Sequence, residues 1–344
     1  MIHNFCTLFD SYYLTRGMAL YESLSKNCDK FHLYIFAFDA QTLDILKSKN
    51  LHSATIISLL DFETDELLEI KSRRTVAEYC WTCTASTITY AIKKYNLDHC
   101  TYVDADIYFF SSLSPIFEEI GDSSVAITPH NFSKELKSSE IYGKYCVQFT
   151  YFKNDKDGMA ALNWWRESCL SWCYAKLQDH RYGDQKYLDY FEEKFKGVHI
   201  VTNIGSGLAP WNISDYQIEL DDTVMLVRKN DIAQKPSPLI FFHYQGLKFF
   251  QKGDLIVSDP SVVSISPEGL NLIYKPYIQR LLSVQSYIEG KPKLDVKISF
   301  KKTFFKKIVF FLSIRLKRFK LVRAIYYLIV NRYSRPRGVG SEIK

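Results

Sequence analysis

The 344-residue sequence lacks any stretch of about 18 apolar residues, the length that a helix needs to cross a bilayer. Its first ten residues, MIHNFCTLFD, carry no basic segment ahead of an apolar one, and Asp10 interrupts the apolar run early. This start is unlike a secretory signal peptide, so we expect a cytoplasmic location. The chain also lacks internal repeats.

Acidic residues are absent from residues 296–341, which contain 13 Lys and Arg. The rest of the chain carries 31 Lys and Arg against 38 Asp and Glu, so an acidic body precedes a basic tail and nucleic acid is not the expected partner. The tail places apolar residues at 305, 308, 312, 316, 319, 322, 326 and 329, the spacing of a helix lying in a membrane interface. We therefore expect residues 291–344 to hold the chain peripherally on an anionic inner membrane surface.

Eight cysteines include two closely spaced pairs, Cys80 with Cys83 and Cys169 with Cys173. Such spacings raise the question of structural zinc. Both pairs lie in helical sequence patterns rather than in the turns of zinc knuckles, and their neighbours are largely apolar. Buried free thiols are the expected outcome.

Strand and helix patterns alternate along the first half of the chain. Strands are predicted at 3–9, 31–38, 53–59 and 100–103, and helices at 14–26, 40–49 and 77–95. Further strands are predicted at 123–130, 146–152 and 237–243, with helices at 115–120, 156–177 and 184–195. This order predicts an α/β fold in which residues 1–290 form one Rossmann-like, mainly parallel sheet flanked by helices.

Two aspartates interrupt the apolar sequence TYVDADIYFF at residues 101–110. Asp104 and Asp106 follow a predicted strand, and open α/β sheets bind ligands at the carboxyl ends of their strands. In an extended backbone the two side chains point the same way and suit Mg²⁺ or Mn²⁺, whose open positions a diphosphate can fill. A structural role is the alternative. A second pair, Asp155 and Asp157 in NDKDG, lies in a polar turn where solvated carboxylates are expected.

CTLFDSYYLTRGMALYESL, the helix before the aspartates and TYVDADIYFF together resemble the nucleotide-sugar glycosyltransferases of the A-type fold, and most closely glycosyltransferase family 8. The resemblance covers roughly residues 2–250 and implies the A-type fold. It implies that Leu8, Asp10 and Tyr13 bind the uracil of the donor. A strand-to-helix turn capped by Asp10 is the alternative for that segment.

The same resemblance extends to the metal and the diphosphate. It assigns the metal to Asp104, Asp106 and His243, as Mn²⁺ or Mg²⁺, and donor contacts to Asp104, Ala105, Gly246 and Lys248. The segment FFHYQGLK resembles the family's His, Gly and Lys series, with HxxGxK in place of the family's HxxGxxK, so the lysine comes one residue early. A structural histidine at the end of a strand is the alternative for His243.

Two further assignments rest on the resemblance. YGDQKYLD carries an Asp-Gln pair like the one that faces the anomeric carbon of the sugar, so Asp184 and Gln185 are the implied catalytic residues; Asp184 also has the position of a helix N-cap. Arg74, one helical turn before Glu78, is implied to meet the donor, with a surface ion pair as the alternative.

The implied function is metal-dependent transfer of a sugar from a nucleoside diphosphate sugar, with UDP-sugar as the expected donor. The acceptor would be a hydroxyl of a glycan or lipid-linked glycan, as in polysaccharide or lipopolysaccharide biosynthesis. Retention of configuration follows from the resemblance alone, and LAPWNI at 208–213 is implied to lie on the acceptor side. A sugar nucleotidyltransferase would need a glycine-rich N-terminal loop, which CTLFDSYYL lacks. A non-catalytic sugar-nucleotide or glycan-binding protein is the other alternative.

Overall fold

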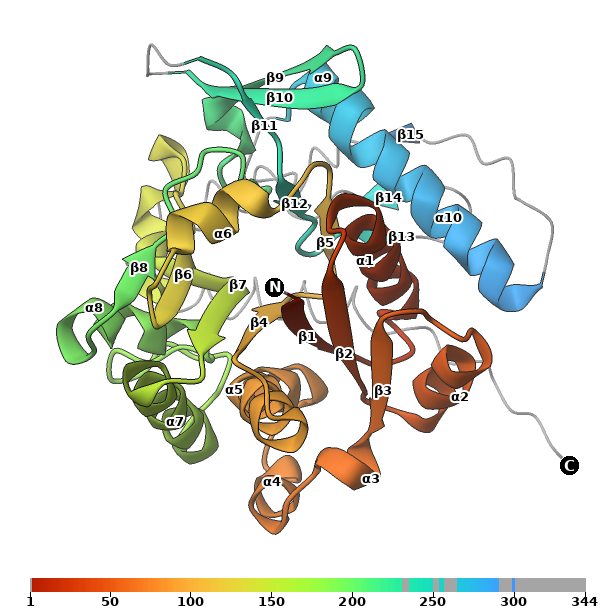
Figure 1. The fold of residues 1–344 in the computed structure, drawn as a ribbon. Coiled ribbons are helices and arrows are strands. Elements are labelled where there is room, and N and C mark those ends of the chain that lie inside the picture. Colours follow the sequence, from red (N-terminus) through yellow and green to blue (C-terminus); the bar gives the residue numbers. More distant parts are fainter. Residues whose placement is uncertain (1, 231–234, 250–253, 257–264, 291–298, 301–344) are drawn as a thin grey trace, which may run out of the picture.

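The computed structural model describes residues 2–230, 235–249, 254–256, 265–290 and 299–300. A seven-stranded sheet lies at its centre in the order β3-β2-β1-β4-β7-β6-β8, with helices around it (Figure 1). Its strands are β1 (His3–Phe9), β2 (Phe31–Ala37), β3 (Ala54–Ser58), β4 (His99–Val103), β6 (Val125–Pro129), β7 (Tyr145–Lys153) and β8 (Val198–Ile200). Six strands run in one direction and β7 runs opposite to its neighbours β4 and β6. The predicted α/β class with a mainly parallel sheet is confirmed.

Helices connect and cover the strands. The α-helices are α1 (Leu14–Asn27), α2 (Ala40–Ser48), α3 (Leu59–Phe62), α4 (Asp65–Lys71), α5 (Val76–Tyr95), α6 (Ser114–Ile120), α7 (Lys156–Ser171), α8 (Phe191–Lys194), α9 (Pro267–Gly269) and α10 (Lys275–Glu289). Shorter turns of 3₁₀ helix are η1 (Lys134–Tyr142), η2 (Gln185–Tyr190) and η3 (Ile213–Asp215), and η4 (Leu270–Tyr274) is a π-helix. Helix α10 packs along α1 (Figure 1).

Three small sheets surround the central one. Strand β5 (Ile107–Phe109) pairs with β12 (Phe241–His243), and β9 (Tyr216–Asp221), β10 (Val224–Lys229) and β11 (Ser237–Pro238) form a second sheet. Strands β13 (Lys248–Phe249), β14 (Asp254–Ile256) and β15 (Ser299–Phe300) form the third. The β5–β12 pair matters for function, because it follows β4 directly and brings a late segment of the chain to the end of the central sheet.

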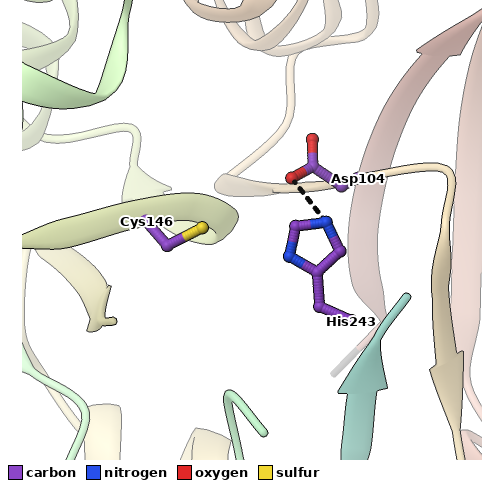
Figure 2. Close-up of side chains that lie close together, drawn as sticks. All are labelled: Asp104, Cys146 and His243. Carbon is purple, nitrogen blue, oxygen red and sulfur yellow. Dashed lines mark ion pairs between the residues drawn. The ribbon is translucent and has the colours of Figure 1, made fainter. Parts of the chain in front are cut away.

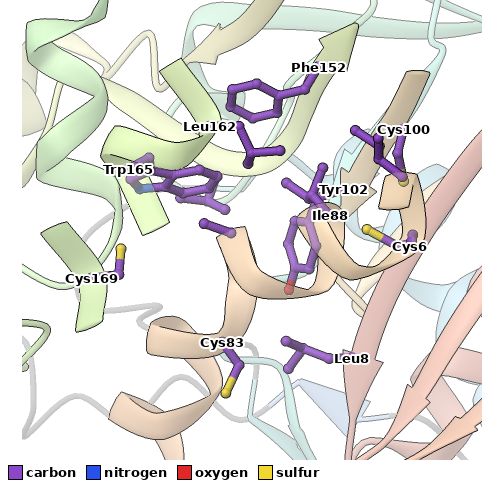
Figure 3. Close-up of a cluster of buried hydrophobic side chains, with 14 of the residues drawn as sticks. Cys6, Leu8, Cys83, Ile88, Cys100, Tyr102, Phe152, Leu162, Trp165 and Cys169 are labelled. Atoms are coloured by element: carbon purple, nitrogen blue, oxygen red, sulfur yellow. The ribbon is translucent and has the colours of Figure 1, made fainter. Parts of the chain in front are cut away.

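The core lies on both faces of the central sheet, and β1 shows why. Its side chains alternate, so Cys6 and Leu8 pack with α5 and α7 while Phe5 and Phe9 pack with α1 and α6. Figure 3 shows the first of these clusters, in which the strands meet Ile88 of α5. This two-sided burial explains the nearly continuous apolar sequence of the parallel strands.

The structure departs from the predicted elements after residue 171. The helix predicted at 156–177 ends at Ser171, because Trp172 is extended (φ −155°, ψ 118°). The Trp172 carbonyl accepts a hydrogen bond from the Tyr187 hydroxyl at 2.7 Å, and the Arg181 guanidinium lies 4.7 Å from the centroid of the Trp172 ring. Residues predicted as one helix at 184–195 form η2 and α8, and the strand predicted at 237–243 is divided into β11 and β12. Tertiary contacts thus override the local helical pattern.

The cysteines form no disulfide among the described residues. Seven of the eight are buried, and Cys80 is half-buried, as expected for free core thiols. Cys83, Cys169 and Cys173 belong to the apolar cluster between the sheet and α5 and α7.

The basic tail falls almost entirely outside the described residues. Only Ser299 and Phe300 of residues 291–344 are described, as strand β15. The domain boundary at residue 290 and the association of the tail with a membrane therefore stay predictions. Within the described part of the chain, no helix has the length and apolar character needed to span a membrane.

Candidate active site

The carboxyl end of β4 and the end of β12 bring three predicted metal ligands together. Asp104 follows β4 directly, and a turn closed by the Ile107 amide and the Asp104 carbonyl (3.1 Å) carries the chain past Asp106 into β5. Because β12 pairs antiparallel with β5, His243 lies opposite Ile107. The Nε2 atom of His243 is 3.1 Å from Asp106 Oδ1 and 3.7 Å from Asp104 Oδ2. Residues 137 positions apart thus meet in one cluster.

The three side chains differ in exposure, at 28% for Asp104, 8% for Asp106 and 5% for His243. Burial acts to lower the pKa of His243, but the charges of Asp106 and Asp104 outweigh it and hold that pKa well above its usual range. Burial raises the pKa of Asp104 to about 6 despite the attraction of His243. Burial also acts to raise the pKa of Asp106, yet attraction to His243 and Arg16 lowers it. The two carboxylates thus favour positive charge on the imidazole beside them.

Gln148 of β7 fixes the orientation of His243, and the sequence interpretation missed it. Its Oε1 accepts a hydrogen bond from His243 Nδ1 at 2.9 Å, so Nε2 is the nitrogen that faces the carboxylates. The Gln148 carbonyl accepts from the Asp104 amide at 3.1 Å, and its buried Nε2 has no hydrogen-bond partner. Carboxylate oxygens and an oriented imidazole nitrogen are donors of the kind that a divalent cation takes. Asp106 joins this set through its contact with His243, and it lies outside the group of donor atoms that are all within 4.8 Å of one another. A glutamine inside the apolar run CVQFTYF was the available signal.

Arg16 of α1 is a second residue that sequence reasoning missed. Among the residues that the structure describes it is the only buried Lys or Arg, at 5% exposure. Its Nη2 donates a 2.6 Å hydrogen bond to the Leu247 carbonyl, in the turn that follows His243, and its guanidinium lies 4.7 Å from the Tyr13 ring centroid. The charge of Asp106 is the largest influence raising the pKa of the Tyr13 hydroxyl, followed by burial. Arg16 and Tyr13 therefore border the Asp106 side of the cluster.

Asp184, the predicted catalytic carboxylate, precedes η2 but makes no side-chain cap hydrogen bond. It is 5% exposed, and its carbonyl accepts a 2.9 Å hydrogen bond from Trp165 Nε1. Burial, followed by the negative charge of Asp104, raises its pKa to about 7. A carboxyl group with this pKa can exchange a proton near neutral pH, which is the property required of a general acid or base.

The raised pKa of Asp184 predicts a pH-dependent stability. Because the pKa rises from 3.8 to about 7 on folding, the folded chain keeps a proton that the unfolded chain releases, and stability falls as pH rises through this window. We expect Asp184→Asn to remove this loss. Between pH 5 and pH 8, the free energy of unfolding of the variant in chelator should gain on that of wild type by up to about 3 kcal/mol. Asp157→Asn is the control. A constant difference between Asp184→Asn and wild type across that range would contradict the raised pKa.

The predicted uracil-binding segment occupies the turn between β1 and α1. Leu8, near the end of β1, is buried and belongs to the core. The Asp10 carboxylate accepts hydrogen bonds from the amides of Tyr12 at 3.1 Å and Tyr13 at 3.3 Å, so it closes the turn. These hydrogen bonds agree with the alternative in which Asp10 caps the strand-to-helix turn. Uracil binding by Leu8 and Asp10 stays a prediction.

The remaining predicted donor residues lie at several places. The guanidinium of Arg74 lies 3.9 Å from the Tyr174 ring centroid, and Gln185 Nε2 donates to the Tyr142 carbonyl at 2.9 Å. Ala105 is buried between the two aspartates. Gly246 has φ +67°, the left-handed conformation that favours glycine, in the turn after His243. Lys248 begins β13, but its side chain lies outside the described residues.

The Trp-Asn segment lies against the cluster. The Trp211 ring packs edge-on against His243 with 5.3 Å between centroids, and its Nε1 donates to the His130 carbonyl at 2.7 Å. Asn212 donates to the same carbonyl at 2.9 Å and so fixes the segment. The Trp211 ring therefore contributes to the burial of His243.

Comparison with known proteins places the chain in a family. No protein-family model matches the sequence. The uncharacterized protein YfnD of Bacillus subtilis (strain 168) is 30% identical over 283 residues, which cover 81% of this chain and 88% of YfnD. The chain belongs to the YfnD family. YfnF, another uncharacterized protein of that strain, is 29% identical over 256 residues, which cover 72% of this chain and 82% of YfnF.

Several solved structures similar to this YfnD relative are glycosyltransferases. Galactosyltransferase LgtC in complex with donor and acceptor sugar analogs is 14% identical, with a TM-score of 0.42 and coverage of 71% of this chain and 87% of LgtC. GlyE of Streptococcus pneumoniae TIGR4 is 12% identical (TM-score 0.46; coverage 85% and 65%), and mouse xyloside xylosyltransferase 1 is 10% identical (0.41; 72% and 98%). With TM-scores below 0.5, these similarities assign no function to the chain. Its function must be argued from its own residues.

Proposed function

We propose that this YfnD relative is a metal-dependent glycosyltransferase that moves a sugar from a nucleoside diphosphate sugar to a hydroxyl group. The observation that carries the proposal is the cluster of Asp104, Asp106 and His243 at the carboxyl end of β4, with an ionisable Asp184 in electrostatic reach. UDP-sugar is the proposed donor, a glycan or lipid-linked glycan the proposed acceptor, and retention the proposed stereochemistry.

Asp104, Asp106 and His243 would hold the cation, Mn²⁺ or Mg²⁺, whose chemistry in such sites is neutralisation of the charge on a leaving diphosphate. Gln148 keeps His243 Nε2 directed at the carboxylates, so the three donors are oriented before any ligand arrives. Arg16 lowers the pKa of Asp106, which favours the ionised carboxylate. It also donates a hydrogen bond to the Leu247 carbonyl and so fixes the turn that follows His243.

Asp184 supports the transfer half of the reaction. Its pKa of about 7 means that both the acid and the carboxylate are present at neutral pH. The carboxylate can accept the proton of an acceptor hydroxyl or stabilise positive charge on the sugar. Gln185, the second proposed catalytic residue, is held by the Tyr142 carbonyl. Tyr13, near Asp106, supplies aromatic surface for the donor, and Trp211, packed against His243, supplies it for the acceptor.

The basic tail supports a membrane-associated acceptor. We propose that residues 291–344 hold the protein peripherally on the inner face of an anionic membrane, because their acid-free part, residues 296–341, combines 13 basic residues with an apolar row at helical spacing. Flotation with anionic vesicles tests this part of the proposal, and a chain ending at residue 290 that still floats would contradict it.

Hydrolysis of nucleotide sugars tests the proposed function. The full-length protein is incubated with UDP-, GDP- and CDP-hexoses, each with Mn²⁺, with Mg²⁺ and with chelator, and release of the nucleoside diphosphate is measured. We expect release from a UDP-sugar that requires the cation and stops in chelator. Calorimetry with UDP gives a second readout, since UDP is expected to bind more tightly when Mn²⁺ is present. Turnover that is unaffected by chelator, or absence of both turnover and binding for all donors, would overturn the proposal.

A further inference from the structure

Cys146 of β7 lies beside the proposed metal ligands. One carboxylate oxygen of Asp104, the Sγ of Cys146 and a ring nitrogen of His243 all lie within 4.8 Å of one another. Figure 2 shows the three side chains. Cys146 is 5% exposed. Within the described part of the chain this is the one group of three or more His, Cys, Asp and Glu side chains with donor atoms this close. Its position beside Asp104 and His243 therefore distinguishes Cys146 from the cysteines that pack in the core.

The backbone of β7 explains why two residues of this strand reach His243. The pairing of β6 with β7 shifts register between Ile127 and Thr128, so that Thr128 lies opposite Cys146 while Ile127 lies opposite Thr150. Irregularities of this kind redirect side chains near functional sites. Gln148 meets the Nδ1 side of the imidazole, and Cys146 approaches from the same strand (Figure 2). The donors thus come from the ends of two strands of the central sheet, β4 and β7, and from the end of β12, which pairs with β5.

The chemistry of the thiol differs from that of the two aspartates. The sulfur of Cys146 is a soft donor, and a cation that it coordinates would hold it as a thiolate. Carboxylates alone suit Mg²⁺ and Mn²⁺, whereas a set of sulfur, imidazole nitrogen and carboxylate oxygen suits Zn²⁺ or Co²⁺. A buried thiol in ligand range should therefore change which cation the site prefers.

We propose that Cys146 is a ligand of the divalent cation together with Asp104 and His243, so that the site prefers a thiophilic cation such as Zn²⁺ or Co²⁺ to Mg²⁺. The proposal rests on the proposed function in so far as that function requires a cation at this cluster. It concerns the identity of the cation and of one ligand, and leaves the donor and the acceptor unchanged.

Titration of the metal-free full-length protein with Co²⁺ tests the proposal without an activity assay. Ligation by Cys146 gives a thiolate-to-Co²⁺ charge-transfer band in the near ultraviolet, in addition to the visible bands of bound Co²⁺. We expect the band in wild type and in Cys28→Ser, a control cysteine that is also buried but lies at the end of α1. Cys146→Ser should lose the band and bind Zn²⁺ at least tenfold more weakly, with Mg²⁺ affinity unchanged.

The outcomes separate this proposal from the proposed function. Visible bands of bound Co²⁺ without the charge-transfer band in wild type would overturn the role of Cys146, and this observation needs no variant that might fail to fold. Unchanged Zn²⁺ affinity in Cys146→Ser would overturn it as well. If donor hydrolysis still requires a cation in either case, the glycosyltransferase proposal stands. Absence of any divalent cation binding by wild type would overturn both.

Discussion

Asp104→Asn is expected to lower cation-dependent hydrolysis of the donor sugar by at least about 100-fold, the scale on which loss of one preorganised electrostatic group acts. The change keeps the size of the side chain and removes its charge. Because Asp104 is the more exposed of the two aspartates, at 28%, its loss should weaken the cation site without a large loss of stability. Release of nucleoside diphosphate at saturating Mn²⁺, with thermal unfolding recorded on the same sample, measures both effects.

Asp157→Asn is the matched control for this experiment. Asp157 belongs to the second Asp-X-Asp pair of the chain, in the first turn of α7, where Asp155 caps the helix by accepting from the Gly158 amide at 2.8 Å. The activity of Asp157→Asn should equal that of wild type. Full activity of Asp104→Asn, or a loss as large in Asp157→Asn, would contradict the assignment of the cation to the first pair. The two pairs share a spacing and differ in their position relative to the sheet.

The position of that pair could be predicted because the information is local. An apolar strand ending in Asp104 and Asp106 indicates the carboxyl end of a parallel strand, and the limits of β1 follow from its apolar run. His243 could be placed by the same reasoning, since it ends the strand predicted at 237–243. The sheet order that brings it beside the aspartates is not encoded in any local pattern.

Gln148, Cys146 and Arg16 could not be assigned from the sequence for a physical reason. Each acts through a partner distant in the chain: Gln148 meets His243 95 residues later, and Arg16 meets Leu247 231 residues later. Polar residues within apolar segments indicate buried partners, but they do not identify them. The same reason explains the end of α7, where contacts from Tyr187 hold Trp172 out of the helix.

Arg16→Met is expected to destabilise the protein by roughly 3–5 kcal/mol, the usual cost of removing one partner of a buried charge cluster. The substitution leaves Asp106 with His243 alone and removes the 2.6 Å hydrogen bond to the Leu247 carbonyl. Urea unfolding of the full-length protein in chelator measures the loss. Arg73→Met is the control, because Arg73 pairs with Glu69 at 2.7 Å with 59% and 73% of the side chains exposed, and such pairs contribute at most about 1 kcal/mol. Equal losses in the two variants would contradict a buried charge cluster.

A divalent cation should restore part of the stability that Arg16→Met loses. Without the guanidinium, the negative charge of Asp106 is less compensated, so a cation bound at Asp104, Asp106 and His243 takes over part of that compensation. A ligand that binds only the folded chain raises its stability, and raises it more in the variant whose folded state needs the charge. We therefore expect Mn²⁺ or Zn²⁺ to raise the melting temperature of Arg16→Met more than that of wild type. An equal or smaller increase would show that the loss comes from the displaced turn at Leu247, and that Arg16 and the cation do not share the charge of Asp106.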